Sequence, residues 1–426
     1  MVRLTRLRID RFRNVKPGTD LRFGPTFNVL LGKNATGKST LLDLIAAVTN
    51  DDLSAYAGED AGFDLTWWLE KGDESVEVQA VRTPARSMAM LDEARDGTEF
   101  EDAWTAVIRA AGAELGRLEV TGMRGTWKPE GEPDESFDVP VGLSAAGARQ
   151  ASTFVIFFKY RWRDETEGLL QTPQGQAIQV ARRVLTHGYS GRFDEATSTF
   201  DVITRSRLVL SRDPDINFRS HDPRLPADLF SQVPSSQVLL VFQFKDLPSL
   251  DEIPALIGFL SAELRPRLLR QSQLGIGIGE ITEYQGFDFL FRRADGSTIS
   301  HDLLSFGQKR LFAFLWYFAV RREHPIVADE LLNGLHHEWI EACFDRLRGR
   351  QSFLATQHPF LLDHIPIESA ESVRTTFIRC AVERDAEGGE RLAWRNFDEE
   401  EAERFFIAYQ TGIQQVSEVL RTEGLW

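Results

Sequence analysis

The chain has 426 residues, which is enough for two or three domains with a sizeable core. Its hydrophobic fraction of 42% and charged fraction of 27% are typical of a soluble globular protein. The formal net charge of −15 argues against a broad non-specific nucleic-acid coat, although it leaves a local basic groove open. No apolar run approaches the roughly 18 residues needed to span a bilayer, so no membrane partner is expected.

The cysteine content and the N-terminus both favour a reducing, cytoplasmic location. The chain has two cysteines, Cys343 and Cys380, and their spacing is not that of a metal site. The opening residues Met1 to Leu4 alternate between basic and apolar types and lack the apolar core of a signal peptide.

The first fifty residues predict a strand, a turn, a second strand, a loop and a helix. The loop lies between a strand-like run at 27–31 and a helix-like run at 41–45. Its sequence is Gly-Lys-Asn-Ala-Thr-Gly-Lys-Ser, with glycines at the first and sixth positions. This is a complete phosphate-binding P-loop in the strand–loop–helix context that the motif requires.

Each residue type in the loop suits a nucleotide. Glycines let the backbone wrap closely, so that its N–H groups and the helix N-terminus face the phosphates. Lys38 is expected to reach the β- and γ-phosphates and to take part in catalysis, and the Ser39 hydroxyl to bind Mg²⁺. The predicted ATP-binding residues here are Gly32, Lys33, Asn34, Ala35, Thr36, Gly37, Lys38, Ser39 and Thr40.

The long stretch at 84–235 carries no recognisable motif. Its pattern predicts a mostly helical insertion, with helices over 87–94, 101–115 and 174–185. A further helix is expected at 251–269. After Gln273 the pattern becomes clearer and predicts, in order, a hairpin around Asp295-Gly296, a helix from Phe306, a strand at 325–328, a helix at 337–347 and a strand at 352–356.

The segment Leu304-Ser305-Phe306-Gly307-Gln308 stands at the start of the predicted helix. It resembles the Leu-Ser-Gly-Gly-Gln signature of ABC-type ATPases, with Phe306 in place of the first glycine. The resemblance implies that Ser305, Gly307 and Gln308 bind the γ-phosphate held by a second, head-to-tail copy. The alternative is a helix simply capped by a serine.

Two later segments resemble further elements of the same ATPases. The strand Pro325-Ile326-Val327-Ala328 ends in Asp329 and Glu330, like a Walker B element, which implies Asp329 as a Mg²⁺ ligand and Glu330 as the residue that activates water. The Asn-Gly-Leu-His run that follows it is common at the dimer seam of this group. The strand ending Thr356-Gln357-His358 resembles the switch-histidine element, with His358 as a catalytic γ-phosphate sensor; a satisfied structural histidine is the alternative.

Together these motifs resemble the SMC/RecF-like branch of ABC-type ATPases, and most of all its compact prokaryotic AAA_15/AAA_21 group, related to the ATPase half of OLD nucleases. The opening Leu-Arg-Ile-Asp-Arg-Phe-Arg-Asn-Val is also typical of that group. The resemblance implies an α/β ABC-type P-loop ATPase core, with ATP and Mg²⁺ as cofactors. The expected domains are 1–83 and 236–426 as two parts of the core, with the insertion at 84–235 between them.

Several roles within this branch are disfavoured. The gap between P-loop and signature is far longer than in a transporter subunit, and no sustained heptads indicate an SMC arm. The residues after His358 are too few for a Toprim nuclease domain, so no nuclease is expected within this chain. Stand-alone ATPases of this type resemble the sensor subunits of anti-phage systems such as Septu and PARIS, in which a separate effector, usually a nuclease, is controlled.

The sequence therefore predicts a homo-oligomeric sensor ATPase with a separate nuclease effector. Two alternatives stay open: a RecF-like repair ATPase that binds DNA directly, and a nucleotide-locked scaffold with little turnover.

Gln79 and Gln150 are both candidates for the glutamine that contacts Mg²⁺ in this class. A set of arginines could follow a nucleic-acid backbone or form a salt-bridged surface; they are Arg205, Arg207, Arg212, Arg219, Arg224, Arg265, Arg267 and Arg270. An apolar helical face, formed by Phe405, Tyr409, Ile413, Val416 and Leu420, could pack on the core or meet an effector.

Overall fold

The computed structural model describes most of the chain, and every structural statement below concerns these residues: 1–56, 59–84, 103–121, 124–129, 134–138, 173–185, 189–194, 203–211, 219–221, 224–231, 240–273, 280–356, 359–385, 388–411 and 415–422. The chain divides into two compact units. Unit 1 comprises Met1–Gly191, Glu323–Val327 and Arg350–Trp426, and unit 2 comprises Arg192–Arg322 and Ala328–Gly349.

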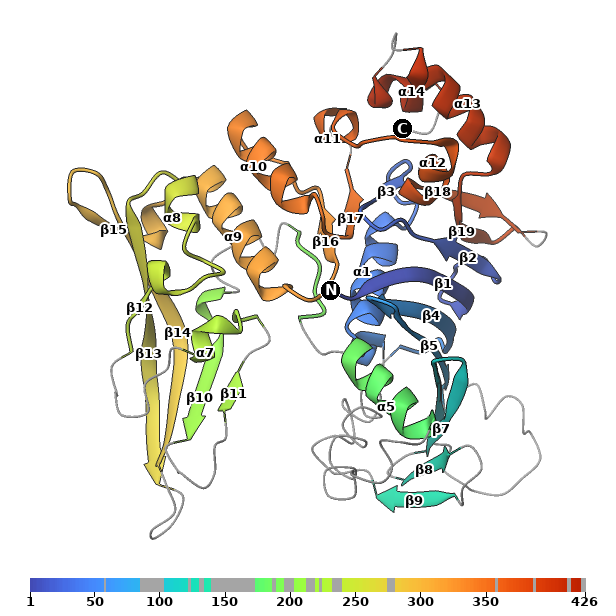
Figure 1. Ribbon diagram of the computed structural model, residues 1–426, viewed down its shortest axis with the longest axis horizontal. Coiled ribbons are helices and arrows are strands. Elements are labelled where there is room, and N and C mark those ends of the chain that lie inside the picture. The colour runs from blue at the N-terminus through green and yellow to red at the C-terminus, as the bar shows by residue number, and fades with distance from the viewer. Residues whose placement is uncertain are drawn as a thin grey trace. The chain divides into compact units, whose positions relative to one another are not determined.

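Unit 1 contains an eight-stranded antiparallel sheet with the order β2-β1-β4-β5-β6-β7-β8-β9 (Figure 1). Each strand pairs antiparallel with its neighbours in this order, and two-residue turns join β4 to β5 and β6 to β7. The helix α5 (Pro173–Val184) lies against it. The strands are β1 (Arg3–Phe12), β2 (Thr19–Arg22), β4 (Phe63–Lys71), β5 (Glu74–Thr83), β6 (Ala103–Ala110), β7 (Ala113–Thr121), β8 (Arg124–Pro129) and β9 (Glu135–Asp138).

A second sheet in unit 1 holds the P-loop strand at its centre. Its order is β16-β17-β3-β18-β19, and β3 is parallel to both β17 and β18. Because all five residues of β3 are buried, this is the central strand expected before a P-loop. The strands are β3 (Phe27–Leu31), β16 (Ile326–Asp329), β17 (Ser352–Ala355), β18 (Phe377–Arg384) and β19 (Glu390–Asn396), and the last two residues of β16 belong to unit 2.

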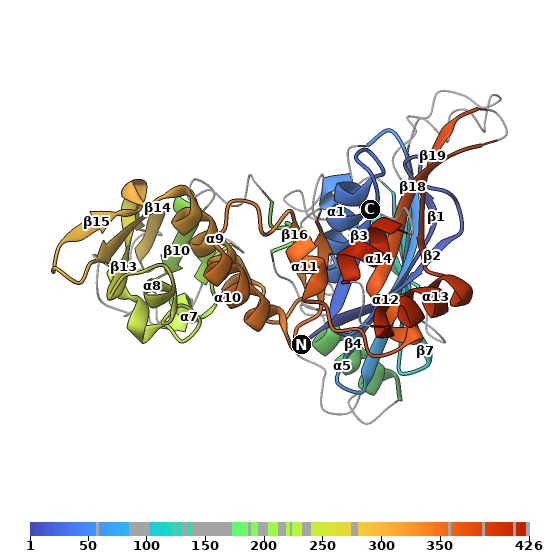
Figure 2. The ribbon, with the colours of Figure 1, turned by 90° about the horizontal axis from the view of Figure 1, so that it is seen from above.

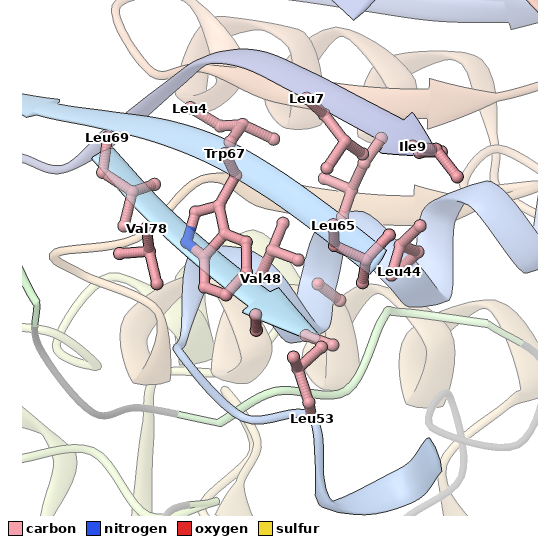
Figure 3. Packing of buried hydrophobic residues seen from close by; sticks show 14 of the residues in the cluster. Leu4, Leu7, Ile9, Leu44, Val48, Leu53, Leu65, Trp67, Leu69 and Val78 are labelled. Carbon is pink, nitrogen blue, oxygen red and sulfur yellow. The ribbon is translucent and has the colours of Figure 1, made fainter. Parts of the chain in front are cut away.

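The helix α1 (Lys38–Thr49) joins the cores of the two sheets. Figure 3 shows Leu44 and Val48 of this helix facing Leu65 and Trp67 of β4. The same buried cluster includes Leu30 of β3, so one continuous core fixes the helix that begins at the P-loop.

Three C-terminal helices lie in unit 1, of which α12 and α13 contact β18 and α14 contacts α13 (Figure 2): α12 (Ala370–Thr376), α13 (Glu399–Gln410) and α14 (Val416–Thr422). The prediction of one helical face over residues 405–420 is therefore wrong, because Phe405 lies on α13 and Leu420 lies on α14. Phe405 packs on Phe377 of β18 with ring centroids 5.3 Å apart, and Val416 and Leu420 are buried. For these residues the apolar face packs on the core, as the plainer alternative predicted.

Unit 2 is built on a second antiparallel sheet with the order β11-β10-β14-β13-β12, and β15 pairs with β14. The helix α9 (Phe306–Val320) packs on this sheet through Phe312 and Trp316, which contact Phe289 of β14. The strands are β10 (Arg207–Ser211), β11 (Arg219–His221), β12 (Phe242–Gln243), β13 (Ser261–Gln273), β14 (Glu280–Arg292) and β15 (Thr298–Ser300). The other helices are α7 (Asp228–Ser231), α8 (Ile253–Leu256) and α10 (His337–Leu347), while α11 (Pro359–Asp363) belongs to unit 1.

The predicted helical insertion is wrong for the described part of 84–235, where strands predominate. The expected helix at 101–115 is instead β6 and the start of β7. Ala111 and Gly112 connect them with positive φ angles of 51° and 79°, the geometry of a two-residue hairpin turn. The expected helix at 174–185 is confirmed by α5, and the one at 87–94 lies outside the described residues.

The expected helix at 251–269 is also largely wrong. Only the four residues of α8 are helical, because the chain turns at Gly258, with φ of 89°, and then enters β13. The predictions after Gln273 hold: the hairpin around Asp295-Gly296 and the helices α9 and α10 all form as expected.

Candidate nucleotide-binding site

The P-loop adopts a conformation that only its glycines permit. Gly32 and Gly37 have φ angles of 153° and 79°, and Gly37 is the N-cap of α1. A Cβ at Gly32 would lie 2.2 Å from the carbonyl oxygen of Cys380, and one at Gly37 would lie 2.7 Å from Cδ1 of Leu392. The loop therefore needs glycine at both positions for backbone conformation and for space.

Lys38 lies folded back over this loop. Its Nζ donates hydrogen bonds to the carbonyl oxygens of Gly32 at 2.8 Å and Lys33 at 2.9 Å. The Thr36 hydroxyl donates to the Lys33 carbonyl at 2.8 Å. The first turn of α1 contains no acidic residue, so the ammonium and the helix N-terminus present positive charge together. Lys33, Asn34, Ala35 and Ser39 are exposed.

The hairpin β18–β19 packs against the P-loop. Trp394 Nε1 donates a 3.0 Å hydrogen bond to the Thr36 carbonyl, and its ring together with Leu392 packs against Gly37. The backbone carbonyl of Cys380 faces Gly32, whereas its thiol is buried, which raises the pKa of the thiol to about 12 and makes it an inert packing group. No local pattern in the sequence connected this hairpin with the P-loop.

In unit 2, Ser305 caps α9. Its Oγ accepts a 3.3 Å hydrogen bond from the Gln308 backbone N–H, and Gln308 Oε1 accepts one of 3.0 Å from the Ser305 N–H. Gln308 Nε2 also donates to the Ile257 carbonyl at 2.9 Å. The serine-capped helix is therefore present, and Ser305 remains exposed at the helix N-terminus, where an anion would bind.

The signature-like segment packs against the Asn-Gly-Leu-His run. A Cβ at Gly307 would lie 2.7 Å from Cζ3 of Trp339, and one at Gly334, whose φ is 75°, would lie 2.5 Å from Cε1 of Phe306. Phe306 nevertheless keeps 68% of its surface exposed. Phe306, which departs from the ABC signature, is thus seated on Gly334 and remains accessible.

Asp329 and Glu330 lie at the end of β16 in unit 2. The Asp329 N–H donates to the carbonyl of Phe193 at 2.8 Å, and both acidic side chains are partly buried. Glu330 has a φ of 49°, which is rare for a residue with a side chain and is typical of functional positions held by their surroundings.

Two arginines that sequence reasoning missed surround these acids. Arg310, which is 1% exposed, donates from its guanidinium to the carbonyl oxygens of Glu330 and Leu331 and lies over the ring of Phe193. Arg192 Nε lies 3.8 Å from Asp329 Oδ2. Arg310 lies two residues after the signature-like segment, and this proximity is the sequence signal that could have indicated it.

Other predicted site residues stand apart from these groups or outside the described part of the chain. Gln79 lies on β5 and donates to Asp64 Oδ1 at 3.4 Å, whereas Gln150 and His358 lie outside the described residues. Thr356, the first residue after β17 and two residues before His358, is buried.

The donor types suit a magnesium ion that a nucleotide helps to hold. Ser39 of unit 1 carries a hydroxyl and Asp329 of unit 2 carries a carboxylate, and both are hard oxygen donors of the kind that Mg²⁺ prefers. Within the described ranges, no group of three or more His, Cys, Asp or Glu side chains is arranged to bind a metal by itself. In nucleotide-dependent magnesium sites, phosphate oxygens complete the coordination. No helix in the described ranges is long and apolar enough to cross a bilayer.

The comparisons with known proteins agree with a P-loop core. Residues 6–82 match the family model described as an AAA domain. Among solved structures, the chain is similar to an SMC head bound to the C-winged helix domain of ScpA, with 12% identity, a TM-score of 0.38, and coverage of 92% of this chain and 98% of that one. No curated protein matches the chain.

Two further SMC heads are similar at the same distant level. One, derived from Pyrococcus furiosus, carries an extended coiled coil and is bound to the C-terminal domain of ScpA; it has 12% identity, a TM-score of 0.38, and coverage of 96% of this chain and 100% of that one. The other, from Thermotoga maritima, has 13% identity, a TM-score of 0.33, and coverage of 93% and 99%. The mixed α/β fold and its P-loop fit an ABC-type P-loop ATPase core, as the sequence predicts.

Proposed function

We propose that this chain is an ATP-binding and hydrolysing sensor subunit of an anti-phage defence system and that it controls a separate nuclease effector. The P-loop supports the ATPase part of this proposal, because its positive-φ glycines and the folded-back Lys38 lie at a helix N-terminus, where phosphate binding is favoured. The defence part depends on the resemblance of the motifs to stand-alone sensor ATPases.

The chain's own residues divide the chemistry. Lys38 would supply positive charge to the β- and γ-phosphates, and Ser39 and Asp329 would hold the metal ion. When bound, Mg²⁺ neutralises charge that develops on the phosphate oxygens. Glu330 orients the attacking water and accepts its proton, and His358 contacts the γ-phosphate.

The second half of each site comes from another copy of the chain. Ser305, Gly307 and Gln308 of one copy face the γ-phosphate bound by the other, in a head-to-tail homodimer. The exposure of Ser305 at the N-terminus of α9 supports this arrangement. Closure on ATP and reopening after hydrolysis would be the signal that the effector receives.

Light scattering of the full chain tests the sandwich. Glu330→Gln should dimerise or assemble further only with ATP and Mg²⁺, and Lys38→Ala should not respond to the nucleotide. The matched control is Asp345→Asn, a change at an exposed carboxylate that pairs with Arg348 on the surface of unit 2. One constant size in all conditions would contradict assembly by nucleotide.

Co-expression with the product of a neighbouring gene tests the defence role. Phage infection should be restricted by the wild-type pair, and Lys38→Ala should abolish the protection while Asp345→Asn keeps it. Protection that survives Lys38→Ala would contradict nucleotide control of the effector.

Measurement of ATP turnover separates the proposal from a nucleotide-locked scaffold. The scaffold predicts equal and negligible turnover in wild type and Glu330→Gln.

The DNA-binding alternative has less support from the arginine set. Arg207 and Arg270 both pair with the buried Glu283, and Arg265 pairs with Glu263. Arg267 lies 3.5 Å from Asp288. These four guanidiniums pair with three carboxylates, which offset most of their charge and favour a salt-bridged surface. Fluorescence anisotropy with duplex DNA, in the presence of ATP, separates this alternative from the proposal.

A further inference from the structure

A short segment before unit 2's main sheet lies directly beside the strand that carries Asp329. Phe193 pairs with Ala328 in a parallel bridge, and its carbonyl accepts the Asp329 N–H. The Phe193 side chain is fully buried and packs edge-on against Phe314 of α9, with ring centroids 5.6 Å apart. This packing fixes the register, so the residues on either side of Phe193 are held next to Asp329.

Those two flanking residues carry opposite charges. Because side chains alternate along an extended backbone, Arg192 and Asp194 point to the same side. Arg192 Nε lies 3.8 Å from Asp329 Oδ2, and its terminal nitrogen lies 3.3 Å from Asp194 Oδ2. The three side chains are 19%, 26% and 17% exposed in the order Arg192, Asp194, Asp329, so solvent screens their interactions only in part.

The Arg192 guanidinium therefore interacts with two carboxylates, those of Asp194 and Asp329, and Asp329 is the proposed metal ligand. A cation that approaches Asp329 must compete with Arg192 for the same negative charge. Asp194 gives Arg192 a second partner, so Arg192 can leave Asp329 without becoming a buried, unpaired charge.

We propose that Arg192 is a positioning residue that competes with Mg²⁺ for Asp329, and that Asp194 sets the strength of this competition. The proposal rests on the proposed function, since it takes Asp329 as a metal ligand. Arg192 would keep the site closed to the metal at low Mg²⁺ and release Asp329 when metal and nucleotide arrive together.

The test is the Mg²⁺ dependence of nucleotide binding by the full chain, measured by fluorescence of mant-ADP, so that no turnover is involved. Arg192→Gln should lower the Mg²⁺ concentration at half-saturation by roughly three- to tenfold, because the competing charge is gone. Asp194→Asn should raise it by roughly two- to fivefold, because the loss of the Asp194 charge strengthens the attraction between Arg192 and Asp329. Arg192→Lys, which keeps the charge, should stay closer to wild type than Arg192→Gln.

Asp329→Asn distinguishes a failure of the proposed Arg192 competition from a failure of the proposed metal role of Asp329. If it flattens the Mg²⁺ dependence while Arg192→Gln and Asp194→Asn stay at the wild-type value, this inference is wrong and the metal role of Asp329 stands. If Asp329→Asn leaves the dependence unchanged, the metal role itself is wrong. Shifts of Arg192→Gln and Asp194→Asn in the same direction would also overturn the competition. Thermal unfolding of each variant checks that the fold is retained.

Discussion

Trp394 Nε1 donates a 3.0 Å hydrogen bond to the carbonyl oxygen of Thr36, in the middle of the P-loop, across a sequence separation of 358 residues. The contact is buried, and it joins the nucleotide loop to the hairpin β18–β19. The P-loop conformation therefore depends on a segment near the other end of the chain as well as on its own glycines.

Trp394→Phe should weaken nucleotide binding as well as stability. The substitution keeps an aromatic ring but leaves the Thr36 carbonyl without its buried donor, which costs about 1–2 kcal/mol of unfolding free energy. Affinity for ATP should fall roughly three- to tenfold, since the loop is less well held. Chemical denaturation and calorimetric titration measure the two effects.

Trp316→Phe is the matched control. Trp316 Nε1 makes a similar 2.9 Å hydrogen bond, to the Arg224 carbonyl in unit 2. This variant should lose comparable stability and keep its ATP affinity. Equal losses of affinity in both variants would mean that general destabilisation explains the effect.

Gly32→Ala should be far more damaging than alanine at another glycine with positive φ. The new Cβ at position 32 would lie 2.2 Å from the Cys380 carbonyl oxygen, so the loop or the strand must move, at about 3 kcal/mol or more. Gly72, with φ of 63°, has no atom within 4 Å of such a Cβ. Gly72→Ala should cost only about 1 kcal/mol and leave ATP binding intact. Similar ATP affinities in the two variants would contradict a close-packed P-loop.

Arg310 should matter for turnover more than for binding. Its guanidinium holds the carbonyl oxygens of Glu330 and Leu331, and it therefore fixes the backbone that positions the Glu330 carboxylate. Arg310→Met should lower kcat by about tenfold or more while ATP affinity changes by less than about threefold. Steady-state hydrolysis and ATP titration give the two quantities.

Arg346→Gln provides the comparison for Arg310. Arg346 pairs at 2.6 Å with Glu252, whose side chain is 74% exposed, so its loss should change stability by less than about 1 kcal/mol and leave kcat unchanged. Arg310→Met kinetics equal to those of Arg346→Gln would remove Arg310 from the account.

The pH dependence of stability should carry the signature of Glu401. Arg395 hydrogen-bonds this carboxylate and lowers its pKa to about 2. Because the folded pKa is depressed, the stabilisation is present above the ordinary pKa near 4.5 and is lost as the pH falls from there towards 2. Since Arg395 is 45% exposed, solvent screening reduces the effect to about 1–2 kcal/mol at pH 7.

Glu401→Gln should therefore destabilise the protein at pH 7 and converge with wild type as the pH approaches 2. Urea unfolding at several pH values measures this. Glu400→Gln, at an 82% exposed partner of Arg404, should change stability by only a few tenths of a kcal/mol. A Glu401→Gln difference that is constant from pH 7 to pH 3 would contradict the ion pair as its cause.

Local signals in the sequence predict the parts of this fold that local chemistry determines. The P-loop glycines, the capping serine Ser305 and the helix at 337–347 all follow from short patterns, and they form as expected. The strand β6 is missed because its alanines favour a helix, while its burial depends on pairing with β5.

The missed contacts of the candidate site share one physical cause. Trp394, Arg192 and Arg310 act through backbone or side-chain groups that are distant in sequence, and nothing in their own neighbourhoods specifies those partners. The roles of the motif residues can be predicted from chemistry, whereas the residues that hold them in place become visible only when the fold brings them together.

The most direct test of the account is single-turnover ATP hydrolysis by the full chain, with ATP binding measured alongside. Wild type should hydrolyse bound ATP, and Lys38→Ala should lose ATP binding. Glu330→Gln should bind ATP within about threefold of wild type but hydrolyse it at least about a hundredfold more slowly. Equal hydrolysis rates in wild type and Glu330→Gln would contradict the central claim that this P-loop site is an ATPase centre with Glu330 as its base.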